Sequence, residues 1–174
     1  MRHRLPPSED LRLVFSGCAF IIHIWAIINL LDALPAWVIR LTAYELAGAI
    51  AYPLFFALLE SLFVWGVLIL AAIILPQSWL RGRFISRGMA LLLVTAGWSI
   101  AIHFIYESLI HHLGLLPLWL VAYLASTGMI VFLAGRYPRV QAILKAVLQR
   151  VEVVTYLYIF IDVLGLFVII ARNI

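Results

Sequence analysis

The sequence predicts an all-α membrane protein in which one domain of 174 residues forms a bundle of five transmembrane helices. Composition is the first reason: 66% of the residues are hydrophobic and 11% are charged, whereas a soluble domain carries about 25% charged residues. A soluble chain of this length cannot hide so much apolar surface, because small proteins leave much of their surface exposed. A lipid bilayer accepts that surface as the outside of a helical bundle.

Five apolar runs are the second reason, because each approaches the roughly 20 residues that a helix needs to cross a bilayer. They cover residues 13–31, 54–75, 88–110, 116–134 and 153–171. Ser8 precedes an acidic turn and is a suitable N-cap for the first helix. Asp32 and Pro35 mark the end of its apolar run. Residues 38–50 are semi-apolar and are expected to form either a helix in the outer interface or an extension of the next span, with a break or kink at Pro53.

Proline and glycine mark the remaining boundaries. Pro76 ends the second run, and Gly114 and Pro117 mark the turn after the third. Pro138 follows the fourth run. Residues 139–150 then predict an amphipathic helix on the cytoplasmic surface, because its apolar residues share one face. Those residues are Val140, Ile143, Leu144, Val147 and Leu148.

The distribution of Lys and Arg predicts a cytoplasmic N-terminus and an external C-terminus. In that orientation only Arg40 and Arg172 fall on the outer side. The inner side holds Arg2, Arg4, Arg12, Arg81, Arg83, Arg87, Arg136, Arg139, Lys145 and Arg150. Basic residues there suit an anionic inner leaflet, and we expect the plasma membrane of a prokaryote. Because no basic stripe on a soluble domain exists, nucleic acid is not an expected partner.

Four ionisable residues fall inside the predicted spans, and a fifth, Glu107, lies near the end of one. A charge at the bilayer centre costs about 2.5–3.5 kcal/mol on insertion scales. At about 1.5 Å of rise per residue, His23 and Asp162 lie ~15 Å and ~14 Å from the inner boundary, and His103 lies ~22 Å from it. Glu60 lies ~9 Å below the outer boundary. These five residues therefore predict a polar cluster in the outer half of the bundle.

The third run ends in the segment HFIYESLIHH, residues 103–112. His103 and Glu107 are four residues apart, so they share one helical face. His111 and His112 are expected where the helix leaves the membrane. The second and third runs are joined by a short loop and should be antiparallel neighbours. Glu60 could then come level with His103.

The predicted cluster has four interpretations. A metal or cation site could use His103, Glu107 and Glu60, although H-x-x-x-E is not the H-E-x-x-H pattern of zinc proteases. Asp, Glu and His chains also form proton pathways. A haem could take His23 and His103 as axial ligands, although their estimated depths differ by ~7 Å. Alternatively, the polar groups only join helices through hydrogen bonds. The sequence does not select a cofactor.

Function follows mainly from what the sequence lacks. No nucleophile elbow, phosphate loop or zinc signature is found, so no catalytic residue is assigned and an enzyme is not favoured. We expect a small non-enzymatic accessory or interaction subunit. Its partners would be the lipid bilayer and either another membrane protein or further copies of the chain. The alternative is a proton- or cation-linked transporter or channel-like protein that uses the cluster. A membrane-embedded metal or haem protein is the third possibility.

Overall fold

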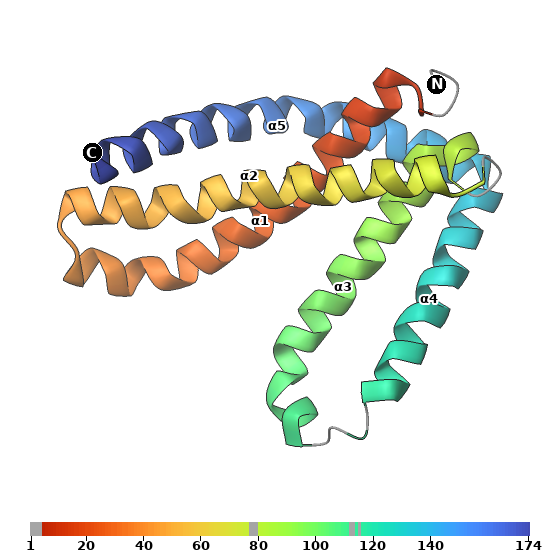
Figure 1. Cartoon of the computed structure of the whole chain (residues 1–174), viewed down its shortest axis with the longest axis horizontal. Coiled ribbons are helices and arrows are strands. Elements are labelled where there is room, and N and C mark those ends of the chain that lie inside the picture. Colours follow the sequence, from red (N-terminus) through yellow and green to blue (C-terminus); the bar gives the residue numbers. More distant parts are fainter. Residues whose placement is uncertain (1–4, 77–79, 112–113, 115) are drawn as a thin grey trace. The chain divides into compact units, whose positions relative to one another are not determined.

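The protein is all-helical in the computed structural model (Figure 1). The structure describes residues 5–76, 80–111, 114 and 116–174, the side chains of residues 81 and 106–111 excepted. Its helices are α1 (Ser8–Arg40), α2 (Ala43–Ile74), α3 (Phe84–His111), α4 (Leu116–Arg136) and α5 (Pro138–Asn173), with a short 3-10 helix η2 (Arg81–Arg83) before α3. In this part of the chain, five helices are long and apolar enough to cross a membrane. The predicted all-α class with five apolar helices is therefore confirmed.

Two helices are longer than the apolar runs that the sequence predicts. Helix α1 continues through Pro35 to Arg40, and α2 begins at Ala43 and continues through Pro53. Residues 38–50 are consequently divided between these two helices: residues 38–40 end α1, and residues 43–50 extend α2, which agrees with the second of the two predicted alternatives for most of the segment. Proline removes one backbone donor, but neighbouring helices and polar side chains compensate for such a loss in long apolar helices.

Thr42 and Glu45 explain why α2 starts where it does. The Thr42 backbone N–H donates to Glu45 Oε2 at 2.9 Å, and the Glu45 backbone N–H donates to Thr42 Oγ1 at 3.4 Å. This reciprocal arrangement is a capping box, which satisfies two backbone donors at the start of a helix. The tight turn between α1 and α2 therefore comes from local side-chain chemistry.

Residues 139–150 form the beginning of α5, which runs without interruption from Pro138 to Asn173. The separate amphipathic helix predicted there is thus the first part of a longer helix. Within that part, Leu148 is buried, whereas Ile143 and Val147 are exposed. The apolar face that the sequence predicts is only partly covered by other side chains of the chain.

The chain divides into two compact units. Unit 1 comprises Met1–Asp10 and Ala71–Ala146, and unit 2 comprises Leu11–Leu70 and Val147–Ile174. In unit 1, α3 and α4 form an antiparallel hairpin (Figure 1). The Arg83 guanidinium donates to the Gly135 carbonyl at the open end of this hairpin, where α3 begins and α4 ends. Lys145 Nζ also forms an ion pair with Glu9 Oε1 at 2.9 Å in this unit.

Unit 2 packs the long parts of α1, α2 and α5 against one another. Small residues permit a close approach of α2 to α5, since a Cβ atom built on Gly165 would lie 3.5 Å from the Ala51 carbonyl oxygen. The Trp65 indole of α2 donates to the Leu11 carbonyl of α1 at 2.9 Å. The buried side chains of this unit include Leu13, Val14, Cys18, Ala19, Ala57 and Leu68.

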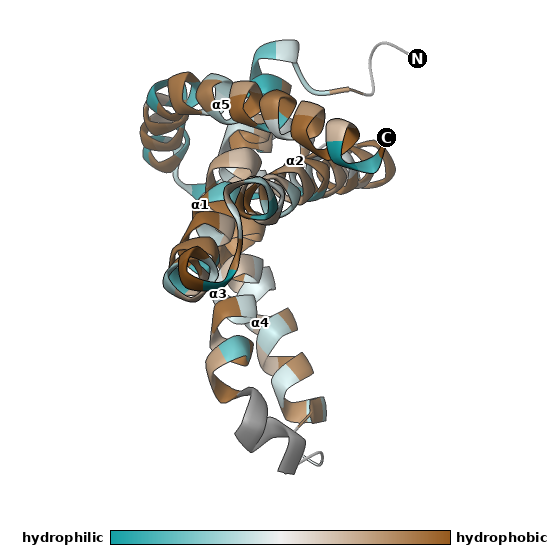
Figure 2. Ribbon diagram, turned by 90° about the vertical axis from the view of Figure 1, so that its left-hand side faces the viewer, coloured by the Kyte–Doolittle hydropathy of each residue, from teal (hydrophilic) through white to brown (hydrophobic). Residues whose placement is uncertain are grey.

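Most of the length of the helices is coloured as hydrophobic in Figure 2, and many of these apolar residues have exposed side chains. Phe63 and Val153 are examples in unit 2, and Phe104 is one in unit 1; each is more than 70% exposed. Contiguous exposed apolar surface on this scale is unusual for a soluble monomer. It is compatible with a multi-pass helical membrane protein.

The contact between Gly165 and α2 leads to a prediction about stability. We expect Gly165→Leu to lower the melting temperature of unit 2 in mild detergent, because a larger side chain would force α5 away from Ala51. Overpacking of this kind costs about 1–3 kcal/mol.

Gly66→Leu is the matched control, because an added Cβ at Gly66 meets no atom within 4 Å and its melting temperature should stay at the wild-type value. Equal melting temperatures for Gly165→Leu and Gly66→Leu would contradict the packing of α5 on α2.

Candidate functional site

The candidate site is a buried pair of side chains, His23 of α1 and Asp162 of α5, in unit 2. His23 Nε2 lies 3.0 Å from Asp162 Oδ2. The His23 side chain is 1% exposed and that of Asp162 is 0% exposed. The carboxyl and the imidazole are therefore shielded from bulk water and form a hydrogen bond with each other. Buried ionisable groups in apolar helices usually form such pairs.

Two further contacts place this pair in a continuous interface between α1 and α5. Thr155 Oγ1 lies 3.4 Å from the Ser16 carbonyl oxygen, and Arg12 Nε lies 2.8 Å from Glu152 Oε1. His23 contacts Asp162 and Ser16 contacts Thr155, and in each pair the partner lies 139 positions later in the sequence. The two helices therefore run parallel in a constant register. We call the polar contacts Arg12–Glu152, Ser16–Thr155 and His23–Asp162 the α1–α5 seam.

The His23 ring is fixed on three sides. Its Nδ1 lies 2.7 Å from the Ala19 carbonyl oxygen, one helical turn earlier in α1. Its plane stacks on the Tyr158 ring, with centroids 4.7 Å apart and an interplanar angle of 5°. Tyr158 precedes Asp162 by one turn of α5, so the two residues share a face of that helix. Helix α5 thus supplies both the carboxylate and the aromatic ring that hold the imidazole.

The chemistry of this arrangement follows from its two acceptors. A carbonyl oxygen accepts hydrogen bonds but cannot donate one, so His23 Nδ1 carries a proton. The neutral His23 ring is consequently the tautomer with its proton on Nδ1, and Nε2 faces the Asp162 carboxyl. Asp and His are residue types that form proton relays in membrane proteins. The same pair also joins α1 to α5 by a hydrogen bond.

The predicted cluster is only partly brought together. The structure pairs His23 with Asp162, whereas Glu60 is exposed on α2. His103 is exposed on α3, where its ring makes an edge-to-face contact with Phe104 at 5.6 Å. Because Glu60 and His103 belong to different units, their predicted proximity stays a prediction. The side chain of Glu107 lies outside the described residues, as do those of His111 and His112.

The described residues do not favour a metal ion or a haem at this site. Among the described residues, no three His, Cys, Asp or Glu side chains are grouped so that they could hold a metal ion. A haem iron would need a free ring nitrogen from His23, but both nitrogens are hydrogen-bonded. In this arrangement His23 therefore does not fit an axial-ligand role.

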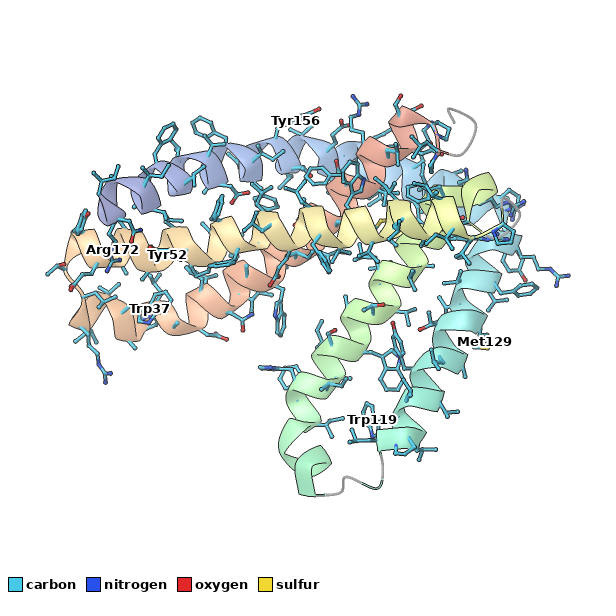
Figure 3. The ribbon with its side chains drawn as sticks, viewed as in Figure 1. Trp37, Tyr52, Trp119, Met129, Tyr156 and Arg172 are labelled. Atoms are coloured by element: carbon cyan, nitrogen blue, oxygen red, sulfur yellow. The ribbon has the colours of Figure 1, made fainter. Side chains whose placement is uncertain are left out.

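Sequence reasoning missed an aromatic cavity between α3 and α4 in unit 1. Its volume is about 340 Å³. The Trp98 and Trp119 rings meet edge to face with centroids 5.0 Å apart, and Figure 3 shows Trp119 between the two helices. The Trp98 indole donates to Ser126 Oγ at 3.0 Å, and the Thr95 and Tyr123 hydroxyls lie 3.1 Å apart. These polar groups already have partners, so the cavity presents mainly apolar surface to a ligand.

Comparison with protein-family models, curated proteins and solved structures finds no match to this chain. The functional argument therefore depends on the residues themselves.

The pairing of His23 with Asp162 predicts a non-additive response to mutation. His23→Leu should lower the free energy of unfolding by about 3–5 kcal/mol, because it leaves an unpaired buried carboxyl. The double variant His23→Leu/Asp162→Leu should recover much of that loss, because it leaves no unpaired polar group. Denaturation in mild detergent measures both effects.

His103→Leu is the control for removal of a histidine in another part of the chain, and it should have little effect on unfolding, since His103 is exposed. If the loss of unfolding free energy in the double variant equalled the sum of the losses in His23→Leu and Asp162→Leu, the two side chains would not be coupled.

Proposed function

We propose that the chain is an integral membrane protein with a cytoplasmic N-terminus that acts as a non-enzymatic interaction subunit. In this proposal, the α2 surface around Glu60 docks against a transmembrane helix of another membrane protein. The orientation is supported by the ten Lys and Arg residues on the inner side against two on the outer. A prokaryotic plasma membrane is the compartment that fits this bias.

The exposure of Glu60 is the observation that carries the proposal. Glu60 is exposed, and its neighbours on the same part of α2 include the exposed residues Phe56, Leu59 and Phe63. A carboxylate among apolar side chains would face hydrocarbon wherever this surface of unit 2 meets lipid. Such a residue costs about 2.5–3.5 kcal/mol near the centre of a span. A polar group from a partner would remove most of that cost.

The chemistry of Glu60 specifies what the partner should provide. A carboxylate selects Lys, Arg, His or an amide donor at the same depth. This chain has no Lys or Arg within its predicted spans, and His23 is already paired with Asp162. His103 belongs to the other unit, so the spans of unit 2 themselves supply no Lys, Arg or unpaired His for Glu60. The complementary donor is therefore assigned to another protein, with the adjacent aromatic and aliphatic side chains packing against the partner helix.

Copurification tests this proposal. The tagged wild-type protein should bring down a defined membrane protein in mild detergent, and Glu60→Leu should reduce the yield of that partner by at least about tenfold, the equivalent of 1.4 kcal/mol. A photo-crosslinking residue at position 63, which lies one turn from Glu60 on the same face, should attach to the same protein in intact membranes.

Glu45→Gln is the control, because Glu45 is also an exposed carboxylate on α2 but lies in the cap at its start. It should leave copurification unchanged. The proposal would be abandoned if the wild-type protein ran as a monomer without a partner. It would also be abandoned if position 63 crosslinked only to this chain or to a second copy.

A further inference from the structure

Within the described part of the chain, one oxygen of the Asp162 carboxyl has no hydrogen-bond partner. Oδ2 bonds to His23, whereas Oδ1 is buried without a donor among the described residues. Buried polar atoms are nearly always hydrogen-bonded, so each exception requires an explanation. An acceptor of this kind could be satisfied by a proton bound to it or by a donor from a water molecule.

The hydrogen bonds of His23 determine how many protons the pair holds. Nδ1 faces the Ala19 carbonyl and therefore carries a proton. A second proton lies between Nε2 and Asp162 Oδ2, because neither atom can face the other at 3.0 Å without one. The pair is either imidazolium with carboxylate or imidazole with carboxylic acid. Its net charge is zero in both forms, which suits a buried site.

From this geometry we propose that the His23–Asp162 pair is a proton-binding site that takes up one proton at Asp162 Oδ1. A hydronium ion gives up the proton and becomes water, and an O–H bond forms at Oδ1. The shared proton then resides on His23 Nε2 and is donated to Oδ2, so the product is imidazolium with carboxylic acid. The net charge of the pair rises from zero to +1, and the hydrogen bond between α1 and α5 is retained.

The surroundings of the pair favour the charged product. The Tyr158 ring lies parallel to the His23 ring at 4.7 Å, and an aromatic face attracts a cation. The other titratable side chain buried on α1 is Cys18. On α2, Glu60 is exposed, and no described side chain of that helix forms a hydrogen bond or ion pair with either member. The remaining charges of the seam, Arg12 and Glu152, lie ~16 Å away along the helices.

A proton fits this site better than a metal cation. Divalent cations such as Ca²⁺ need about six or more oxygen ligands, whereas the pair offers a single unused carboxylate oxygen. Among the described residues there is no group of three potential metal ligands. A proton needs only one acceptor atom. The inference uses the membrane insertion of the proposed function but not the docking role of Glu60, so proton uptake and copurification can fail independently.

Proton counting tests the inference on the full-length protein in phosphatidylcholine nanodiscs. Over the whole pH range in which both proteins stay folded, wild-type protein should take up one more proton per chain on acidification than His23→Gln/Asp162→Asn. The two amides of that variant can hydrogen-bond to each other but do not titrate in this range. Equal uptake by the two proteins would overturn the proposal.

Glu60→Gln is the matched control, because it removes a carboxylate of unit 2 outside the pair. The difference of one proton should persist when Glu60→Gln is added to both proteins. Its disappearance in that background would assign the proton to Glu60 and would overturn the proposal.

Spectroscopy of the wild-type protein gives an answer that does not depend on a variant folding correctly. Acidification should either move the His23 ring ¹⁵N signals to those of imidazolium or add an infrared carboxylic-acid band from Asp162, depending on the starting form of the pair. His23→Gln and Asp162→Asn serve only to assign the signals. If neither signal changed over the same range, the pair would be a fixed hydrogen bond and the proposal would be wrong.

Discussion

The hydrogen bond between His23 and Asp162 controls how α1 packs on α5 in unit 2. Neither side chain has water as an alternative partner, because both are almost completely buried. A displacement by one residue would rotate one partner by about 100° around its helix and leave two unsatisfied polar groups. The Ser16–Thr155 and Arg12–Glu152 contacts follow with nearly the same offset. Polar contacts therefore determine the register, whereas apolar residues supply most of the packing area.

Glu60 and Asp162 are both carboxyl groups in apolar helices, where a charge is costly, but their surroundings differ. Asp162 shares a proton with a histidine of the same chain, so the pair as a whole carries no net charge and tolerates burial. Glu60 has no such neighbour within unit 2 and lies on the apolar exterior of α2. This contrast separates the two proposals physically. The buried carboxyl is suited to binding of a proton, and the exposed one is suited to recognition of a donor from another protein.

Much of the fold could be predicted from the sequence, but less of the site. The length and composition of each apolar run are sufficient to predict five helices. Pro35 and Pro53 suggest helix boundaries, but both lie inside helices, because proline is tolerated inside long apolar helices. The similar depths of His23 and Asp162 were a signal of their pairing. Similar depth alone does not predict a contact between His23 and Asp162. Helices α1 and α5 are far apart in the chain, and periodicity does not reveal which helix faces meet. The exposure of Glu60 likewise depends on the rotation of α2.

The register of α1 against α5 is the central claim, and disulfide crosslinking measures it most directly. With Cys18 replaced by Ser, cysteines at positions 16 and 155 should form a disulfide in native membranes, because the Thr155 hydroxyl lies 3.4 Å from the Ser16 carbonyl and the helix backbones at this level are therefore close. Cysteines at 16 and 159, one turn away, should crosslink poorly. A disulfide that formed more readily from 16 to 159 or from 16 to 151 than from 16 to 155 would contradict the register and, with it, the pairing of His23 with Asp162.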